Sequence, residues 1–223
     1  MTWLPSDIYT HPANAAEAIA QQNALREKLR IEDDFSALHT ILGVDVGYDI
    51  QNNTSGASIV LMRLPSLEQI TTLKVSTPTL FPYISGLLSF REIPAILAAL
   101  EQLEHKPDLL MVDGQGIAHP RRMGIAAHLG VMIDIPSIGV AKSRLCGNYN
   151  EPDLIKGAQT PLFHRNEHVG TVLRSRDNVK PLFVSPGHRI SIQSATKLVQ
   201  QCLTRYRLPE PVRQADKISK FRK

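Results

Sequence analysis

The chain reads LGVDVGY at residues 42–48 and LLMVDGQG at residues 109–116, two short apolar runs that each carry an aspartate followed within two residues by glycine. Runs of this length and composition are typical of buried β-strands. Neighbouring strands of one sheet lie about 4.8 Å apart, so aspartates at adjacent strand positions can bring their oxygens to one cation. A single aspartate of this kind is more often a turn former, but the pair Asp45 and Asp113 predicts a site for a divalent metal ion.

Length and composition favour a single domain over residues 1–223, with an N-terminal helix and a basic C-terminal tail. A chain of 223 residues, 43% of them hydrophobic, can bury a sizeable core and is short for two domains. The net charge of +4 permits a polyanionic partner without requiring one. The tail suits a phosphate backbone, although a charged, frayed terminus is equally ordinary. Its cations, set against one acid at Asp216, are Arg213, Lys217, Lys220, Arg222 and Lys223.

Cysteine usage and hydropathy indicate a cytoplasmic protein. Cys146 and Cys202 show no paired spacing, which excludes a disulfide framework or a zinc-binding pattern, and we expect both thiols to be buried. Residues 1–12 lack the basic and apolar regions of a signal peptide, and no apolar stretch reaches the length of a membrane span. We therefore expect no membrane partner.

Periodicity along the chain predicts an α/β fold of the ribonuclease H-like type, a mixed central sheet flanked by helices. Three strands in succession, joined by short turns, predict an antiparallel meander, and a helix then returns a parallel strand beside the first. The first half of the chain gives a helix over 14–32, strands over 40–48, 56–63 and 67–76, a helix over 93–103 and the strand that ends at Asp113. The second half gives a helix over 121–132, strands over 137–141, 168–174 and 181–185, and a helix capped by Ser191.

The glycine-rich turn at residues 113–116 is followed by residues suited to phosphate. It is not a dinucleotide-binding loop, because His119 stands where that motif needs its third glycine. His119 is either a general acid or phosphate ligand or a plain loop histidine, while Arg121 and Arg122 suit phosphate. Lys142 follows another short strand, where it could offset phosphate charge or could simply be solvated.

The segment PYISGLLSFRE at residues 82–92 is rich in apolar residues for a loop. Such loops can act as wedges that enter a base stack, or their aromatic residues can pin the loop to the core. Glu92 matches a helix capping box with Ser89. Pro94 argues against that cap, because it would fall just past the first turn, so we expect the helix to begin nearer residue 92 and to leave this carboxylate free.

Taken together, these segments resemble the endonuclease V family, and the resemblance covers most of the chain. It implies a ribonuclease H-like fold and a magnesium-dependent endonuclease, with Mn²⁺ as an alternative ion, that acts on inosine in DNA or RNA as a monomer. The implied cut is at the second phosphodiester bond 3′ to the inosine and leaves 3′-hydroxyl and 5′-phosphate ends. The matching stretches are GVDVGY (43–48), PYISG and SFRE within 82–92, PDLLMVDGQGIAHPRR (107–122), IPSIGVAKSRLCG (135–147), SPGHRIS (185–191) and RLPEPVRQAD (207–216).

The resemblance also implies roles for individual residues. Asp45, Asp113 and Glu92 resemble the metal ligands of the family, and Asp216 completes the acidic cluster. His119 and Lys142 resemble catalytic residues on the phosphate side, and Tyr83 resembles the wedge. The pocket for an extruded base would draw on Gly86, Leu88, Gly114 and Ile125.

The chain departs from the family pattern at two positions. Ser85 replaces a proline, which should loosen the wedge loop, and Gln115 replaces a histidine, so a histidine there cannot be essential in this chain.

Two other functional classes fit parts of the sequence. The Asp45-Val46-Gly47 motif also begins sugar-kinase and chaperone-type ATPases, but that architecture needs two such lobes and this chain has no internal repeat. A nucleic-acid binding module with a vestigial site would keep the same segments without cleaving. ATP turnover would favour the first class, and binding of inosine-containing DNA without cleavage would favour the second.

Overall fold

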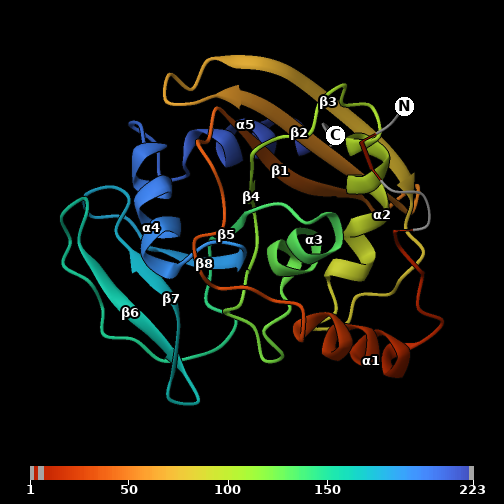
Figure 1. Ribbon diagram of the computed structural model, residues 1–223, viewed down its shortest axis with the longest axis horizontal. Coiled ribbons are helices and arrows are strands. Elements are labelled where there is room, and N and C mark those ends of the chain that lie inside the picture. The colour runs from red at the N-terminus through yellow and green to blue at the C-terminus, as the bar shows by residue number, and fades with distance from the viewer. Residues whose placement is uncertain (1–2, 5–7, 221–223) are drawn as a thin grey trace.

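The computed structural model describes residues 3–4 and 8–220, so Arg222 and Lys223 of the basic tail lie outside the described residues. The described chain forms one mixed sheet in the order β3-β2-β1-β4-β5-β8-β7-β6, flanked by helices (Figure 1). This confirms the predicted ribonuclease H-like α/β fold. The strands are β1 Thr40–Asp49, β2 Thr54–Arg63, β3 Gln69–Pro78, β4 Leu109–Val112, β5 Ser137–Ala141, β6 Gln159–His164, β7 Glu167–Leu173 and β8 Leu182–His188. The helices are α1 Ala15–Arg26, α2 Ser89–Leu100, α3 Ile125–Ile133, α4 Ile192–Gln201 and α5 Glu210–Ser219.

Strand pairing places the two aspartates side by side. β1, β2 and β3 pair antiparallel, as the meander predicts, and β1 pairs parallel with β4 so that Val44 lies opposite Val112. Asp45 and Asp113 are the next residues on these two chains, and the Asp113 amide donates to the Val44 carbonyl at 2.9 Å. The expectation that both carboxylates meet at one edge is therefore confirmed at the level of the backbone.

Each face of the sheet has its own apolar core. Leu42 and Val44 pack with α2 and α3, whereas Ile41 packs with α4 and α5. Because side chains alternate along a strand, Gly43 and Asp45 lie on the α5 face with Ile41. Helix α5 passes so close that a Cβ on Gly43 would lie 2.1 Å from the Pro211 carbonyl oxygen. Glycine at this position lets the helix approach the strand that carries Asp45.

Helix α2 begins at Ser89, not nearer residue 92 as expected. Its N-cap position is Leu88 and has no side-chain cap, and the Ser89 hydroxyl pairs instead with the buried His128 Nδ1 at 2.9 Å. Pro94 lies inside the helix, where its missing N–H removes a bond to the Phe90 carbonyl. The Tyr9 hydroxyl donates to that carbonyl at 3.2 Å, so a long-range contact satisfies the group that the proline leaves unpaired.

Other differences from the expected elements have local causes. Helix α1 ends at Arg26. Helix α3 begins at Ile125, because the segment before it is a turn with positive φ at Arg122. Strand β6 contains Pro161 and lies at the sheet edge, and α5 follows Pro209, so neither showed a clear pattern. The cap at Ser191 is confirmed. Cys202 is buried as expected, whereas Cys146 is half-buried. Among the described residues, no helix is long and apolar enough to cross a membrane.

Candidate metal and nucleic-acid site

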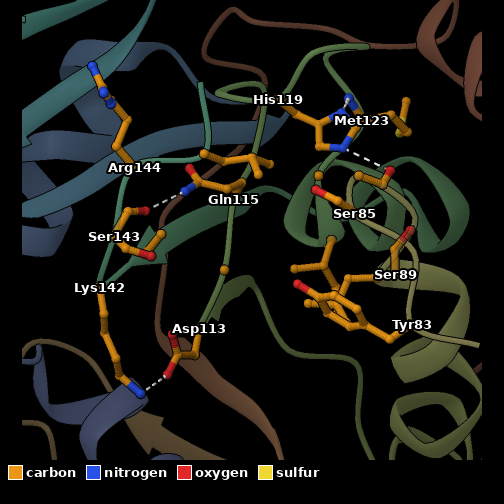
Figure 2. A pocket seen from close by; sticks show the side chains of 17 residues that line it. Tyr83, Ser85, Ser89, Asp113, Gln115, His119, Met123, Lys142, Ser143 and Arg144 are labelled. Carbon is orange, nitrogen blue, oxygen red and sulfur yellow. Dashed lines mark hydrogen bonds and ion pairs between the residues drawn. The ribbon is translucent and has the colours of Figure 1, made fainter. Parts of the chain in front are cut away.

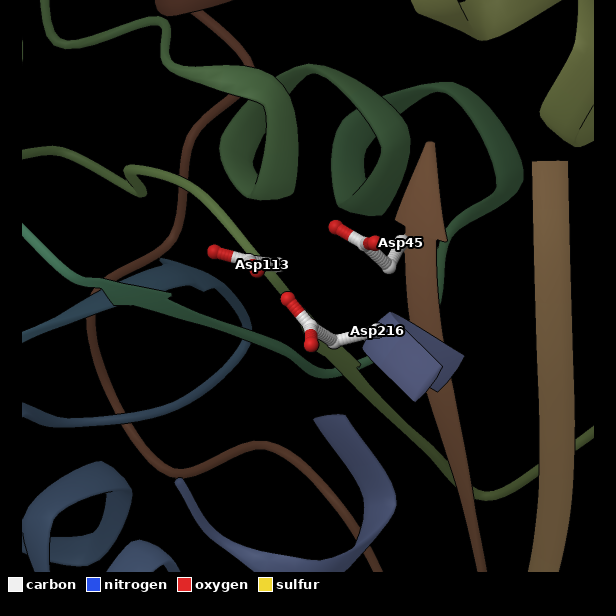
Figure 3. Close-up of side chains that lie close together, drawn as sticks. All are labelled: Asp45, Asp113 and Asp216. Carbon is white, nitrogen blue, oxygen red and sulfur yellow. The ribbon is translucent and has the colours of Figure 1, made fainter. Parts of the chain in front are cut away.

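Three carboxylates from distant parts of the chain converge at one point (Figure 3). Asp45 comes from β1, Asp113 follows β4 and Asp216 lies on α5, and one oxygen of each lies within 4.8 Å of the others. Asp113 Oδ2 is buried, and the Lys142 ammonium lies beside it. Three converging carboxylates suit a hard divalent cation, which prefers oxygen ligands. We call this group the carboxylate cluster.

The cluster is electrostatically strained at Asp45. Burial and the neighbouring charge of Asp113 raise the pKa of Asp45 to about 7. The Ser219 hydroxyl, one helical turn after Asp216, donates to Asp45 Oδ2 and opposes this rise. Burial also raises the pKa of Asp216, but the ammonium groups of Lys142 and Lys220 outweigh it and hold that pKa below its ordinary value. The chain thus offsets the repulsion with one hydroxyl and two cations.

Lys142 pairs with two carboxylates of the cluster, although part of its side chain is exposed to solvent. Its Nζ is 2.5 Å from Asp113 Oδ2 and 2.5 Å from Asp216 Oδ1. Burial disfavours the charged amine, but the two carboxylates more than compensate and raise the pKa of Lys142. The ammonium is therefore a fixed positive charge beside the carboxylate oxygens.

Glu92 is close to the cluster but is not one of the three converging carboxylates. It is buried on α2, and the Tyr48 hydroxyl donates to its Oε1 at 2.6 Å. Burial, followed by the charges of Asp45 and Asp113, raises the pKa of Glu92 to about 8, while the Tyr48 hydrogen bond lowers it. Tyr48 lies on the face of β1 opposite Asp45, which explains the separation. Direct metal ligation by Glu92 stays a prediction.

A cavity of about 370 Å³ adjoins the cluster and shares Asp113 and Lys142 with it. We call it the Tyr83 cavity. Figure 2 shows Asp113 and Lys142 on one side of it and Tyr83 and His119 on the other. All five residues expected to recognise a base or fill its place line this cavity: Tyr83, Gly86, Leu88, Gly114 and Ile125.

The loop that carries Tyr83 is clamped at one carbonyl. Gly86, at φ 78°, presents its carbonyl oxygen to His119 Nε2 at 3.0 Å, Arg121 Nη2 at 2.8 Å and Gln22 Nε2 at 3.0 Å. Phe81 and Leu87 are buried, whereas Tyr83 is 72% exposed. The flanks of this segment are therefore pinned to the core, as one interpretation expects. Its tip projects, and the wedge role of Tyr83 stays a prediction. The clamp acts through the residue after Ser85, and a looser loop caused by Ser85 stays a prediction.

His119 serves the loop and is not brought to the carboxylates. Its Nδ1 accepts from the Arg121 amide at 3.1 Å, so the ring proton is on Nε2 and is donated to Gly86. Burial and then the Arg121 charge lower the pKa of His119 to about 4, which keeps the ring neutral. The structure thus places a neutral, fully engaged imidazole here, and a direct catalytic role stays a prediction.

Arg121 and Arg122 are also committed to the protein. Arg121 Nε donates to Gln22 at 2.6 Å, and Arg122 Nε donates to Glu167 at 2.8 Å. Neither residue lines the Tyr83 cavity. Their predicted phosphate contacts would require these interactions to open. Gln115, the other departure, donates to the Ser143 carbonyl at 3.0 Å and braces the cavity wall.

Sequence reasoning missed three residues that organise the site. Gln22 is fully buried although it lies on a mostly polar helix, Tyr48 holds Glu92, and Ser219 contacts Asp45 across 174 residues of sequence. A signal existed for Ser219, since a hydroxyl one turn after Asp216 shares its helix face. The other two contacts depend on tertiary packing.

Comparison with known proteins supports one family. The family model described as Endonuclease V matches residues 23–217. Endonuclease V of Rippkaea orientalis is 51% identical over 95% of this chain and 92% of its own length. The Alkalilimnicola ehrlichii protein of the same name is also 51% identical, over 94% of this chain and 93% of its own.

Solved structures agree with these relatives. The crystal structure of Endonuclease V from Streptomyces avermitilis has a TM-score of 0.88 at 37% identity and covers 98% of this chain and 96% of its own. Ciona intestinalis Endonuclease V, crystallised with a 24mer DNA containing an inosine followed by a ribo-adenosine, has a TM-score of 0.80 at 31% identity, over 92% of this chain and 95% of its own. The chain belongs to the endonuclease V family.

Proposed function

We propose that the protein is a magnesium-dependent repair endonuclease that recognises inosine in nucleic acid. It hydrolyses the second phosphodiester bond 3′ to the inosine and leaves 3′-hydroxyl and 5′-phosphate ends. The observation that carries this proposal is the adjacency of the carboxylate cluster and the Tyr83 cavity, which share Asp113 and Lys142. One surface can thus bind a displaced base and present a backbone phosphate to the carboxylates.

Asp45, Asp113 and Asp216 would hold Mg²⁺, with Mn²⁺ as an alternative, and Glu92 is the further acid that we propose for this site. The bound ion supplies charge stabilisation at the phosphate and a more acidic water. Lys142 would contribute a second positive charge to the phosphate oxygens when a substrate enters, since its ammonium already lies beside Asp113 and Asp216. Ser219 orients the Asp45 carboxylate through its hydroxyl.

The Tyr83 cavity would accept the base. Its lining combines the apolar side chains of Leu88 and Ile125 with two glycines, Gly86 and Gly114, whose lack of side chains leaves room for a flat ring. An inosine costs less to extrude than a soundly paired base, and this difference is one source of selectivity. Tyr83, exposed at the loop tip, can enter the stack that the base leaves.

We also propose that one chain acts alone in a reducing compartment such as the cytoplasm. A single chain supplies the three converging carboxylates and the cavity. Both cysteines are free thiols, which is typical of reducing compartments.

Matched oligonucleotides with and without one inosine test the proposal. We expect the purified protein with Mg²⁺ to nick the inosine strand at one position and to leave the control strand intact. Parallel DNA and RNA strands would establish the preferred backbone. Binding of the inosine strand without cleavage under Mg²⁺ or Mn²⁺ would contradict the proposal and favour a binding module.

A further inference from the structure

A second hollow lies on the α5 side of the carboxylate cluster. It has a volume of about 360 Å³, and we call it the α5 groove. It shares Asp216 with the cluster, as the Tyr83 cavity shares Asp113, so the two hollows flank the carboxylates. The other polar residues that line it are four cations and one aromatic: Arg207, Arg213, Lys217, Lys220 and Tyr206.

The floor of the groove is a fixed platform. The guanidinium carbon of Arg213 lies 4.2 Å from the Tyr206 ring centroid, and that of Arg205 lies 5.1 Å from it. Glu210 holds Arg213 with a 2.6 Å ion pair. Stacked aromatic and guanidinium groups beside free cations are the common surface for a single nucleic-acid strand.

The cations of the groove differ in what they already bind. Arg207 donates to the carbonyl of Lys142 at 2.8 Å, which ties the groove to the cluster. Lys220 pairs with Asp216 at 2.9 Å. Lys217 is exposed, and within the described chain no carboxylate lies within ion-pair distance of it. Lys217 is therefore the cation that can take a phosphate without breaking a contact of the cluster.

The Tyr83 cavity, the carboxylate cluster and the α5 groove follow one another in this order, which sets the direction in which a bound strand would run. A strand with its inosine in the Tyr83 cavity and its cleaved phosphate at the carboxylates leaves on the side of Asp216. We propose that the α5 groove binds the phosphates of the strand on the 3′ side of the cleaved bond. This inference rests on the proposed function, because a cut 3′ to the inosine makes the departing segment the 3′ flank.

Truncated substrates combined with a groove variant test the proposal. Metal-free binding, measured by fluorescence anisotropy, and single-turnover cleavage would both be followed on inosine strands whose 3′ flank is long or ends just beyond the cut. We expect the wild-type protein to bind the long flank more tightly. Lys217→Ala should weaken binding of the long-flank strand by about threefold to tenfold and should reduce the gap between the two substrates. The slope of log affinity against log salt should fall by about 1.

Matched controls distinguish loss of binding in the α5 groove from the general effect of removing one positive charge. Lys197→Ala removes an exposed lysine from α4 and should leave the flank dependence unchanged. Truncation of the 5′ flank should affect Lys217→Ala and wild type equally. Equal loss by Lys217→Ala on long and short 3′ flanks, or no loss on either, would overturn the groove proposal while inosine cleavage stands. Absence of inosine cleavage by the wild type would instead overturn the proposed function.

Discussion

The carboxylate cluster and the Tyr83 cavity meet at Asp113 and Lys142, and the chain holds them in opposite ways. In the cluster, like charges are forced together, and burial with the Asp113 charge raises the pKa of Asp45 to about 7. In the cavity, three donors converge on the Gly86 carbonyl, an arrangement without repulsion. The cluster therefore lowers the stability of the metal-free protein, whereas the cavity loop is a stabilising element.

The largest expected effect is the loss of cleavage in Asp45→Asn. If Asp45 binds the metal as we propose, its replacement should reduce cleavage by more than about 100-fold, beyond the range typical of outer-sphere partners. The metal-free variant should be at least as resistant to urea as the wild type, because the strained charge disappears and Ser219 can still donate to the amide oxygen. Single-turnover kinetics and urea unfolding measure the two quantities.

Asp49→Asn is the matched control for this substitution. Asp49 ends the same strand but lies outside the carboxylate cluster, and it caps the hairpin turn through its carboxylate. We expect it to retain cleavage. A metal-free Asp45→Asn protein clearly less stable than the wild type would mean that the cluster is not the strained region.

The sequence predicted the features that depend on local pattern. Asp45 and Asp113 each follow a short apolar run, and the length and composition of these runs indicated buried strands with a polar residue at the end. Contacts that join distant segments left no such pattern: Gln22 reads as one more polar residue of an exposed helix, yet it is fully buried against Gly86.

The contacts of His119 and of helix α5 also left no pattern in the sequence. Proximity of His119 to Asp113 in sequence suggested a catalytic acid, but the turn directs its ring to the loop carbonyl. Helix α5 has a narrow apolar stripe behind two prolines, so its residues resembled a frayed tail although the helix packs on β1 and supplies Asp216.

Two aromatic residues of the loop should act on different properties, Phe81 on stability and Tyr83 on the binding of inosine strands. Phe81 is buried, so Phe81→Ala should lower the free energy of unfolding by about 3–5 kcal/mol. Tyr83 is 72% exposed, so Tyr83→Ala should change stability by no more than about 0.5 kcal/mol. Tyr83→Ala should nevertheless weaken binding of inosine strands, by about 1–3 kcal/mol if the ring stacks on a base. Unchanged affinity would exclude the wedge.

The hydrogen bonds to the Gly86 carbonyl should contribute less to the free energy of unfolding than the Phe81 side chain does, but more than any surface residue. Gln22→Ala leaves Arg121 Nε without its 2.6 Å partner and removes one donor from Gly86, so we expect a loss of about 1–3 kcal/mol in unfolding free energy. Discrimination between inosine and adenine strands should fall with it. Asn23→Ala, exposed on the same helix, is the control. A Gln22→Ala protein of wild-type stability would show that the clamp is redundant.

Metal-free stability should depend on pH, and the buried carboxyl groups and the buried histidines should drive it in opposite directions. Burial raises the pKa of Asp45 to about 7 from 3.8 and that of Glu92 to about 8 from 4.5. Between the ordinary pKa and the raised pKa of each carboxyl group, the folded state binds more protons than the unfolded state. The unfolding free energy therefore rises as pH falls from about 8. Burial lowers the pKa of His119 to about 4 and that of His128 to about 3 from 6.5, so these residues reduce stability as pH falls below 6.5.

Metal-free stability should therefore rise as pH falls from about 8 to about 6.5 and change little from there to about pH 5, where the two carboxyl groups and the two histidines offset each other. Urea unfolding in a chelator across this range measures it. Asp45→Asn should reduce the rise on the alkaline side and should let stability fall below about pH 6.5, because the two histidines then outweigh Glu92 alone. Added Mg²⁺ should also remove the alkaline rise, because a bound cation favours ionised carboxylates. A wild-type protein that loses stability between pH 8 and 6.5 in the chelator would show that the carboxylates are not held against their charge, and the contrast between the two regions would fail.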